Sequence, residues 1–279
     1  MFGYVEGQFC AQDNKGVSFP LPAFQYGYGL FETIRICNGS PLWVDQHFMR
    51  LLQGLEVLDI RLKLTVNELN LILNKLIQIN RIKQGSLKIV VIPAGDNPFT
   101  GYDQMDGTLI VTCRDGVNRS EESYRRGAFV KTMESIRRNE NSPLSNIKCL
   151  NYCDNVIARR KALSAGAQEG LLLNNQGYVA EGAASNIFWY DGDNLKTPAV
   201  SSGILPGIAR SKVLSLAQGL SLNSMEVLST LHELYSAKEV FMTNSLIGVM
   251  PVTRIDNVTI GTGQPGTITK ELVKRIYPS

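Results

Sequence analysis

The sequence predicts an α+β protein of two domains. Three observations point to it: apolar residues recur at helical spacing in some segments, short β-branched runs stand in others, and a polar stretch interrupts the chain near its middle. The 279 residues, of which 44% are hydrophobic and 19% charged, suffice to bury a substantial core. No repeat of fixed period occurs in the sequence, which excludes solenoids and propellers.

The first half of the chain predicts two helices followed by two strands. Apolar residues at helical spacing follow Asp45, which we take as the N-cap of the first helix. Thr65 and Glu68 are spaced as a capping box and predict the start of the second helix. The runs 87–92 and 108–112 are short and β-branched, as strands are. We therefore expect a small N-terminal domain over residues 1–114.

The second half predicts a strand-rich domain with helices packed outside. Hydrophobic order lapses between Arg114 and Arg126, so we place an interdomain linker at residues 115–125 and the second domain at 126–279. Its predicted elements are a helix over 152–165 closed by Gly166, a hairpin through 170–181, a strand pair over 186–197, a helix from Gly207 to Gly219, a short helix capped by Thr230 and Glu233, and a strand at 239–243.

Composition narrows the class of ligand. The formal net charge is +3 and no long basic run occurs, so we expect a small-molecule ligand and no nucleic acid. Two histidines and five cysteines without a C-x-x-C pair make a metal site unexpected. The N-terminus carries Glu6 and Asp13 where a secretory signal needs an apolar run, and no stretch approaches the ~20 apolar residues of a membrane span. We expect a cytoplasmic protein with reduced thiols and no membrane partner.

One nucleotide-binding pattern is discarded. The segment 261–266 fits G-x-G-x-x-G, but no strong strand precedes it and Pro265 stands where a helix should begin. We predict a loop there.

Three separate segments carry chemistry. Lys148 lies in an apolar, turn-rich stretch before a helix, where partial desolvation would make its amine a usable nucleophile or base; the alternative is a surface lysine at a helix start. Glu181 ends a hairpin strand among small residues and could face a protonated ring nitrogen, or it is a turn carboxylate satisfied by nearby N–H groups. The helix start after Gly207 and the strand end Thr243–Asn244 could each present donors to a phosphate, although such features are common.

Together these segments resemble the class IV aminotransferase family, the fold-type IV enzymes that use pyridoxal 5'-phosphate (PLP). The resemblance covers nearly the whole chain, through the motifs at residues 24–35, 47–51, 142–152, 178–188, 205–210 and 243–252. It implies a D-amino acid aminotransferase-like fold, with a small N-terminal α/β sandwich and a larger C-terminal pseudo-barrel. It also implies a homodimer with its active site between the two domains and near the partner subunit.

The resemblance assigns roles to particular residues. Lys148 would be the lysine that joins the cofactor covalently, Glu181 would pair with the pyridine nitrogen, and Arg50 would bind the phosphate. Further cofactor contacts would be Tyr152, Ser185, Asn186, Ile208, Ala209, Thr243 and Asn244, and the substrate contacts would be Tyr26, Phe31 and Thr33.

Within the family, three activities compete. Branched-chain aminotransferases usually have K-x-G-G-N-Y, whereas this chain is one residue shorter from Lys148 to Asn151 and has Thr33 in place of a glycine. D-amino acid enzymes typically carry an Arg-x-His carboxylate trap where residues 93–99 stand here. The motifs at 137–144, 147–152 and 243–252 most resemble 4-amino-4-deoxychorismate lyase, although only Gly101–Tyr102 of a common lyase loop is kept and Tyr28 replaces a usual aspartate. We expect that lyase, with a class IV aminotransferase acting on branched-chain L-amino acids or D-amino acids with 2-oxoglutarate as the alternative; a PLP-binding protein without catalysis is more remote.

Overall fold

The computed structural model describes residues 1–12, 22–94, 98–99, 104–116 and 120–277, and its chain divides into two compact units. Unit 1 comprises Met1–Asn118 together with Ile147–Tyr152, and unit 2 comprises Arg119–Asn146 with Cys153–Ser279. The domain limits expected at residues 114 and 126 stay a prediction. The segment with Lys148, which we had placed in the second domain, groups by its contacts with unit 1.

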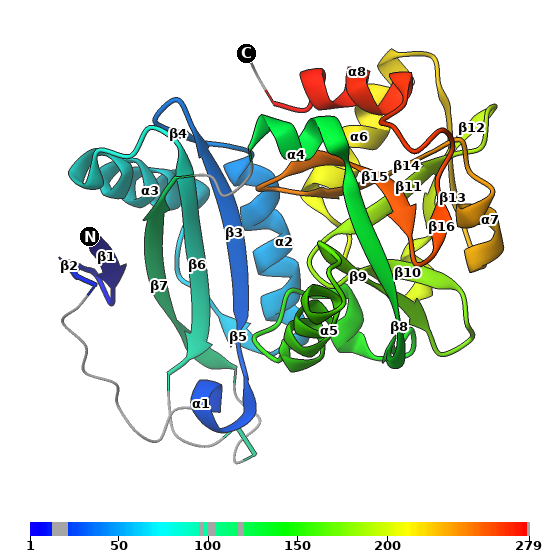
Figure 1. The fold of residues 1–279 in the computed structure, drawn as a ribbon. Helices are drawn as coiled ribbons and strands as arrows, with labels where there is room; N and C mark the ends of the chain where they lie inside the picture. The colour runs from blue at the N-terminus through cyan, green and yellow to red at the C-terminus, as the bar shows by residue number, and fades with distance from the viewer. Residues whose placement is uncertain (13–21, 95–97, 100–103, 117–119, 278–279) are drawn as a thin grey trace. The chain divides into compact units, whose positions relative to one another are not determined.

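Unit 1 is built on a seven-stranded sheet (Figure 1). Its strand order is β2-β1-β7-β6-β3-β4, and β5 pairs with β7. The strands are β1 (Phe2–Val5), β2 (Gln8–Ala11), β3 (Leu30–Cys37), β4 (Ser40–Pro41), β5 (Ile60–Arg61), β6 (Gly85–Pro93) and β7 (Met105–Asp115). The predicted strands at 87–92 and 108–112 are therefore confirmed as parts of β6 and β7, and β3 is an additional strand between β6 and β4.

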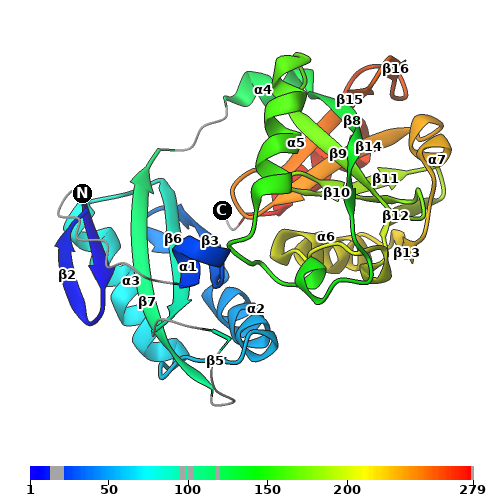
Figure 2. The ribbon, with the colours of Figure 1, turned by 90° about the horizontal axis from the view of Figure 1, so that it is seen from below.

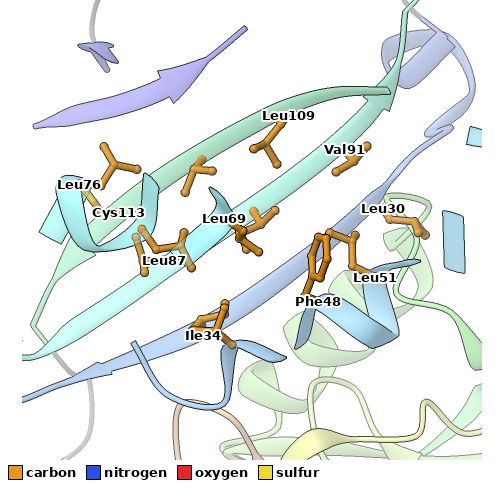
Figure 3. Close-up of a cluster of buried hydrophobic side chains, with 14 of the residues drawn as sticks. Leu30, Ile34, Phe48, Leu51, Leu69, Leu76, Leu87, Val91, Leu109 and Cys113 are labelled. Carbon is orange, nitrogen blue, oxygen red and sulfur yellow. The ribbon is translucent and has the colours of Figure 1, made fainter. Parts of the chain in front are cut away.

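Helices α2 (Val44–Val57) and α3 (Val66–Asn80) pack against this sheet, and a short helix α1 (Pro22–Tyr26) precedes β3. Figure 3 shows the resulting core, in which leucines of both helices interdigitate with alternate residues of β3, β6 and β7. The capping box at Thr65 is confirmed, with the Glu68 amide donating to Thr65 Oγ1 and the Thr65 amide donating to Glu68 Oε2. The expected N-cap Asp45 is wrong: α2 starts earlier, after Trp43 with φ 58°, so Asp45 lies in the first turn, where its charge favours the helix dipole.

Unit 2 is built on a nine-stranded sheet that curls into a half-barrel (Figure 1). The order is β10-β9-β8-β15-β14-β11-β12-β13, and β16 pairs with β15. The strands are β8 (Ala128–Arg138), β9 (Glu169–Asn174), β10 (Val179–Gly182), β11 (Asn186–Tyr190), β12 (Asn194–Pro198), β13 (Asn223–Val227), β14 (Glu239–Asn244), β15 (Gly248–Ile255) and β16 (Val258–Thr259). The predicted hairpin, strand pair and final strand are confirmed as β9–β10, β11–β12 and β14.

Helices cover the outside of this sheet (Figure 2). Helix α5 packs against β8 and β9, α6 against β13 and β14, and α8 against β14 and β15. The helical segments are α4 (Glu121–Arg126), α5 (Cys153–Ser164), α6 (Ile208–Gly219), α7 (Leu231–Tyr235), α8 (Thr267–Arg275) and two 3₁₀ turns, η1 (Pro143–Asn146) and η2 (Val200–Ser202). The stacked rings of Phe188 and Phe241, both fully buried, lie in the interior.

Some expectations for unit 2 need correction. Helix α4 (Glu121–Arg126) includes residues 121–125 of the expected linker, where no helix was predicted; the Ser120 hydroxyl accepts from the Ser123 amide and caps its first turn. Thr230 is the N-cap of α7, but its side chain makes no capping hydrogen bond. The loop predicted at 261–266 is confirmed, yet a nine-residue helix follows it at Thr267. No helix within the described ranges is long and apolar enough to cross a membrane.

Candidate active site

The backbone of the Lys148 segment is attached to strand β3 within unit 1. The Phe31 amide donates to the Lys148 carbonyl at 2.9 Å, and the Leu150 amide donates to the Gly29 carbonyl at 2.8 Å. An isolated antiparallel bridge joins Leu30 to Cys149 between these two hydrogen bonds. The segment thus pairs in antiparallel fashion with the start of β3, and this pairing fixes the position of the Lys148 main chain.

Two glycines make room for this pairing. Gly27 has φ +65°, and an added Cβ would lie 3.3 Å from the Asn151 backbone. Gly29 has φ +150°, and its Cβ would lie 2.7 Å from the Val91 carbonyl oxygen and 2.9 Å from a Leu150 methyl group. Both positions therefore require glycine for the backbone conformation and for the close approach of neighbouring chain.

The amine of Lys148 lies against two aromatic rings. Its Nζ is 4.4 Å from the centroid of Phe31 and 5.4 Å from that of Tyr152, and the two rings meet edge to face at 5.3 Å. Ring faces attract a cation while removing part of its water. The side chain of Lys148 is partly buried, which fits the expected partial desolvation; its chemical role stays a prediction.

The substrate contacts expected from the sequence are only partly brought together. Thr33 pairs with Lys88 across β3 and β6, and Lys88 Nζ lies 4.8 Å from the centroid of Phe31. Lys88 is exposed and has no ion pair with any described residue. Tyr26 lies on α1, half exposed, with its ring edge to face with Phe99 at 5.2 Å. Phe31 is thus the ring shared by two lysines, and Lys88 is a neighbour that the sequence did not single out.

Arg50 belongs to a buried ion cluster that sequence reasoning missed. Its Nε and Nη2 donate to the two carboxylate oxygens of Glu32 at 2.8 Å each, and His47 Nδ1 lies 2.7 Å from Glu32 Oε2. Burial alone would raise the pKa of Glu32, but the charge of Arg50 and the hydrogen bonds from His47 and Arg50 outweigh it and lower the pKa to about 2. The sequence does contain an indication of this cluster. Glu32 stands between Leu30 and Ile34 on the core-facing side of its strand, where a buried carboxylate needs hydrogen-bond or ionic partners.

Glu181 lies in unit 2 at the end of β10, buried and held from several sides. The Leu205 amide donates to its Oε2 at 3.0 Å, and Asn186 Nδ2 lies 3.4 Å from the same oxygen. Arg138 Nε is 3.1 Å from Oε1, and this guanidinium also donates to the Gly203 and Ser145 carbonyls. The groups around it all donate to the carboxylate oxygens, and a carboxylate can pair with a protonated ring nitrogen that faces it.

Asn186 and Thr243 are directly paired across β11 and β14. The Asn186 side chain donates to the Leu205 carbonyl at 2.9 Å and contacts Gly207, the N-cap of α6. The Thr243 hydroxyl is fully buried and has no hydrogen-bond partner among the described residues. An orphaned buried hydroxyl is costly, so a group bound beside it that accepts its hydrogen would be favoured.

The N-terminus of α6 lies next to Asn186, through Gly207. Helix α6 begins at Ile208 and Ala209, both buried, and Gly207 makes no side-chain cap, so the first amides of a twelve-residue helix remain available to an anion. Ser185 Oγ donates to Glu169 Oε2 at 3.3 Å. The Asn244 side chain donates to the Ala184 carbonyl and accepts from the Leu246 and Ile247 amides. The unpartnered Thr243 hydroxyl and the first amides of α6 are donors that suit a phosphate. The side chains of Ser185 and Asn244 instead form hydrogen bonds within the protein.

Comparison with known proteins gives concordant matches. The family model described as amino-transferase class IV matches residues 29–255. The aminodeoxychorismate lyase of Bacillus subtilis is 32% identical, over 96% of this chain and 91% of its own, and the D-alanine aminotransferase of Bacillus licheniformis is 33% identical, over 95% and 92%. The crystal structure of the branched-chain amino acid aminotransferase of T.th. with pyridoxamine 5'-phosphate superposes with a TM-score of 0.91 at 28% identity, covering 99% of this chain and 92% of that one.

These matches confirm the expected α+β fold of the fold-type IV enzymes. The amine, the buried carboxylate and the phosphate-compatible donors described above fit the cofactor that such enzymes use. The chain belongs to the class IV aminotransferase family, and it is an enzyme of lyase or aminotransferase type that depends on pyridoxal 5'-phosphate.

Proposed function

We propose that the protein is a lyase that converts 4-amino-4-deoxychorismate into 4-aminobenzoate and pyruvate, a step of folate biosynthesis. The observation that carries this choice lies beside Phe31, where the exposed cation of Lys88 has no acidic partner among the described residues. The lyase substrate has two carboxylates, and a nearby ammonium group is suited to bind one of them. The similarity to the Bacillus subtilis lyase along 96% of the chain supports the same choice.

An aminotransferase is the second candidate, because the Bacillus licheniformis D-alanine enzyme is as similar as the lyase. Against D-amino acid activity, Pro98 and Phe99 stand in the stretch where those enzymes typically carry their Arg-x-His trap. Against branched-chain activity, Thr33 replaces the usual glycine and the segment from Lys148 to Asn151 is one residue shorter.

In unit 1, Lys148 would be the catalytic residue. When bound, PLP supplies a conjugated ring that accepts the electron pair left when the substrate's amine-bearing carbon loses a proton. Lys148 Nζ would anchor the cofactor and then take that proton, with Phe31 and Tyr152 limiting its motion and its access to water. Arg50 would hold the phosphate, and Tyr26, Phe31 and Thr33 would face the substrate.

In unit 2, Glu181 would keep the ring nitrogen protonated, since an ionised carboxylate favours the cationic form of a nitrogen it contacts. The amides of Ile208 and Ala209 and the Thr243 hydroxyl would bind the phosphate. Ser185, Asn186 and Asn244 would shape the loops around it, and Tyr152, from unit 1, would contact the cofactor ring.

The reaction balances without a second substrate. One proton leaves C4 of the ring, the carbon–oxygen bond to the enolpyruvyl group breaks, and that group takes up a proton to give pyruvate while the ring becomes aromatic. An aminotransferase instead needs a 2-oxo acid to accept the amino group. The lyase therefore turns over with one substrate, and this difference separates the two candidates.

The test is to incubate the PLP-loaded protein with 4-amino-4-deoxychorismate alone, and separately with L- and D-amino acids plus 2-oxoglutarate. Stoichiometric 4-aminobenzoate and pyruvate without any 2-oxo acid are expected. Formation of glutamate from D-alanine or from a branched-chain amino acid, with no 4-aminobenzoate, would assign the protein to the aminotransferases instead.

We also propose that the enzyme is a cytoplasmic homodimer. The family resemblance supports the dimer, and the five cysteines, all free thiols, suit a reducing compartment. Light scattering behind size exclusion would return twice the 30.8 kDa chain mass for the dimer and the single mass against it.

A further inference from the structure

The buried cluster of Glu32, His47 and Arg50 has no role in the assignments above beyond the phosphate contact of Arg50. We propose that Glu32, steadied by His47, is a positioning residue that holds the Arg50 guanidinium in the orientation needed to bind the cofactor phosphate. This inference rests on the proposed phosphate-binding role of Arg50.

The hydrogen-bond geometry defines one edge of the guanidinium. Arg50 Nε donates to Glu32 Oε1 and Nη2 donates to Oε2, both at 2.8 Å, so the carboxylate grips the Nε side of the planar group with two parallel bonds. Two bonds remove rotation about the last side-chain torsions. The opposite edge, which includes Nη1, is then directed away from Glu32 by the planarity of the guanidinium.

Glu32 and His47 are themselves immobilised. Glu32 lies on β3 and His47 on α2, one turn before Arg50, and both side chains are only 1% exposed. The carboxylate can only accept, so His47 Nδ1 must carry the hydrogen in their 2.7 Å contact. Since α2 packs against β3, the cluster connects the arginine to both elements.

The pairing with Glu32 changes how Arg50 would attract a phosphate. The carboxylate offsets the arginine charge, so a phosphate would be recognised more by the placement of the remaining donors than by net charge. Two explanations therefore predict opposite results when the carboxylate is neutralised. If Glu32 positions Arg50, the phosphate binds more weakly; if Glu32 only offsets the charge, the phosphate binds more tightly.

Glu32→Gln separates them, because the amide keeps the size but offers one acceptor in place of two. The probes are PLP and pyridoxal, which differ by the phosphate alone, titrated into the cofactor-free protein. We expect Glu32→Gln to weaken PLP binding roughly 10- to 100-fold, the range of a charge-assisted hydrogen bond, and to leave pyridoxal binding unchanged. Glu32→Asp, which keeps the negative charge but shortens the side chain by one methylene, serves if Glu32→Gln does not fold: positioning predicts the same selective loss, and charge offset alone predicts no change.

The matched control is Asp106→Asn, which breaks another Arg–carboxylate contact of unit 1: Arg61 donates to Asp106 through both Nε and Nη2, but on the exposed surface. It should change neither affinity. Tighter PLP binding by Glu32→Gln, or an equal loss of PLP and pyridoxal affinity, overturns the inference. A wild-type protein that binds the two aldehydes equally would instead refute the phosphate role of Arg50, and with it part of the proposed function.

Discussion

Phe31 contacts Lys148 twice: its amide donates to the Lys148 carbonyl at 2.9 Å, and its ring centroid lies 4.4 Å from Lys148 Nζ. One residue of β3 therefore places both ends of the lysine. The main-chain bond sets where the side chain starts, and the ring face limits where the amine ends. The position of Lys148 therefore depends on the sheet of unit 1.

Lys148→Ala should abolish the covalent link to PLP and reduce turnover by at least the ~10²- to 10⁴-fold that a positioned base contributes. Borohydride reduction of the PLP-loaded protein followed by peptide mapping should label position 148 in the wild type and leave the variant unlabelled. Lys161→Ala, on the exposed part of α5, is the control and should retain label and turnover. A labelled variant peptide at another lysine would remove Lys148 from its assigned role.

Gly29→Ala should destabilise unit 1 and disturb the lysine. The added methyl group meets the Val91 carbonyl at 2.7 Å and a Leu150 methyl group at 2.9 Å, at a φ of +150°. We expect a loss of about 1–3 kcal/mol in the free energy of unfolding and weaker PLP attachment. Gly116→Ala is the control, because Gly116 also has a positive φ but nothing lies within 4 Å of its Cβ; it should cost only about 1 kcal/mol and spare the cofactor. Equal effects of the two substitutions in urea unfolding would argue against the close approach.

Much of this architecture follows from short-range sequence signals, and the exceptions share a cause. The Thr65 capping box and the β9–β10 hairpin were predictable because their determinants lie within a few residues. The pairing of Cys149 with Leu30 was not, because it joins segments far apart in the chain. Similarly, the strand pattern alone shows that Glu32 faces the core but cannot say that α2 supplies its partners.

Glu181→Gln should slow turnover roughly 100-fold while PLP stays attached. A neutral amide no longer favours a protonated ring nitrogen, but it keeps the size of the side chain and an acceptor for the Leu205 amide. Turnover and the content of borohydride-trapped cofactor are measured on the same preparation. A variant with full turnover would contradict the role assigned to Glu181, and one that fails to retain cofactor would show that the carboxylate serves binding instead.

Acid should destabilise the native protein through Glu32. The pKa of this carboxyl falls from 4.5 to about 2 on folding, so the folded state holds the proton less well than the unfolded state. The contribution to stability is fully present above about pH 4.5 and is lost as the pH falls toward 2, and it amounts to about 3 kcal/mol. Urea unfolding between pH 7 and pH 3 should show this dependence in the wild type and less of it in Glu32→Gln. Glu68→Gln, at an exposed helix cap, is the comparison; if it flattened the profile as much, the cluster would not be the source.

Thr243→Val separates a ligand-binding hydroxyl from a structural one. The Thr243 hydroxyl is buried without a partner among the described residues, so its removal should leave the cofactor-free protein as stable as before or more stable by about 1 kcal/mol. The affinity for PLP should fall, and that for pyridoxal should not. Thr197→Val is the matched control: Thr197 is equally buried in the same sheet, but its hydroxyl donates to the Ile187 carbonyl at 2.9 Å. That substitution should lower stability by about 1–3 kcal/mol and spare the preference for the phosphorylated aldehyde. If Thr243→Val instead lost stability like Thr197→Val and kept its PLP affinity, the hydroxyl would have a partner within the protein and no role toward phosphate.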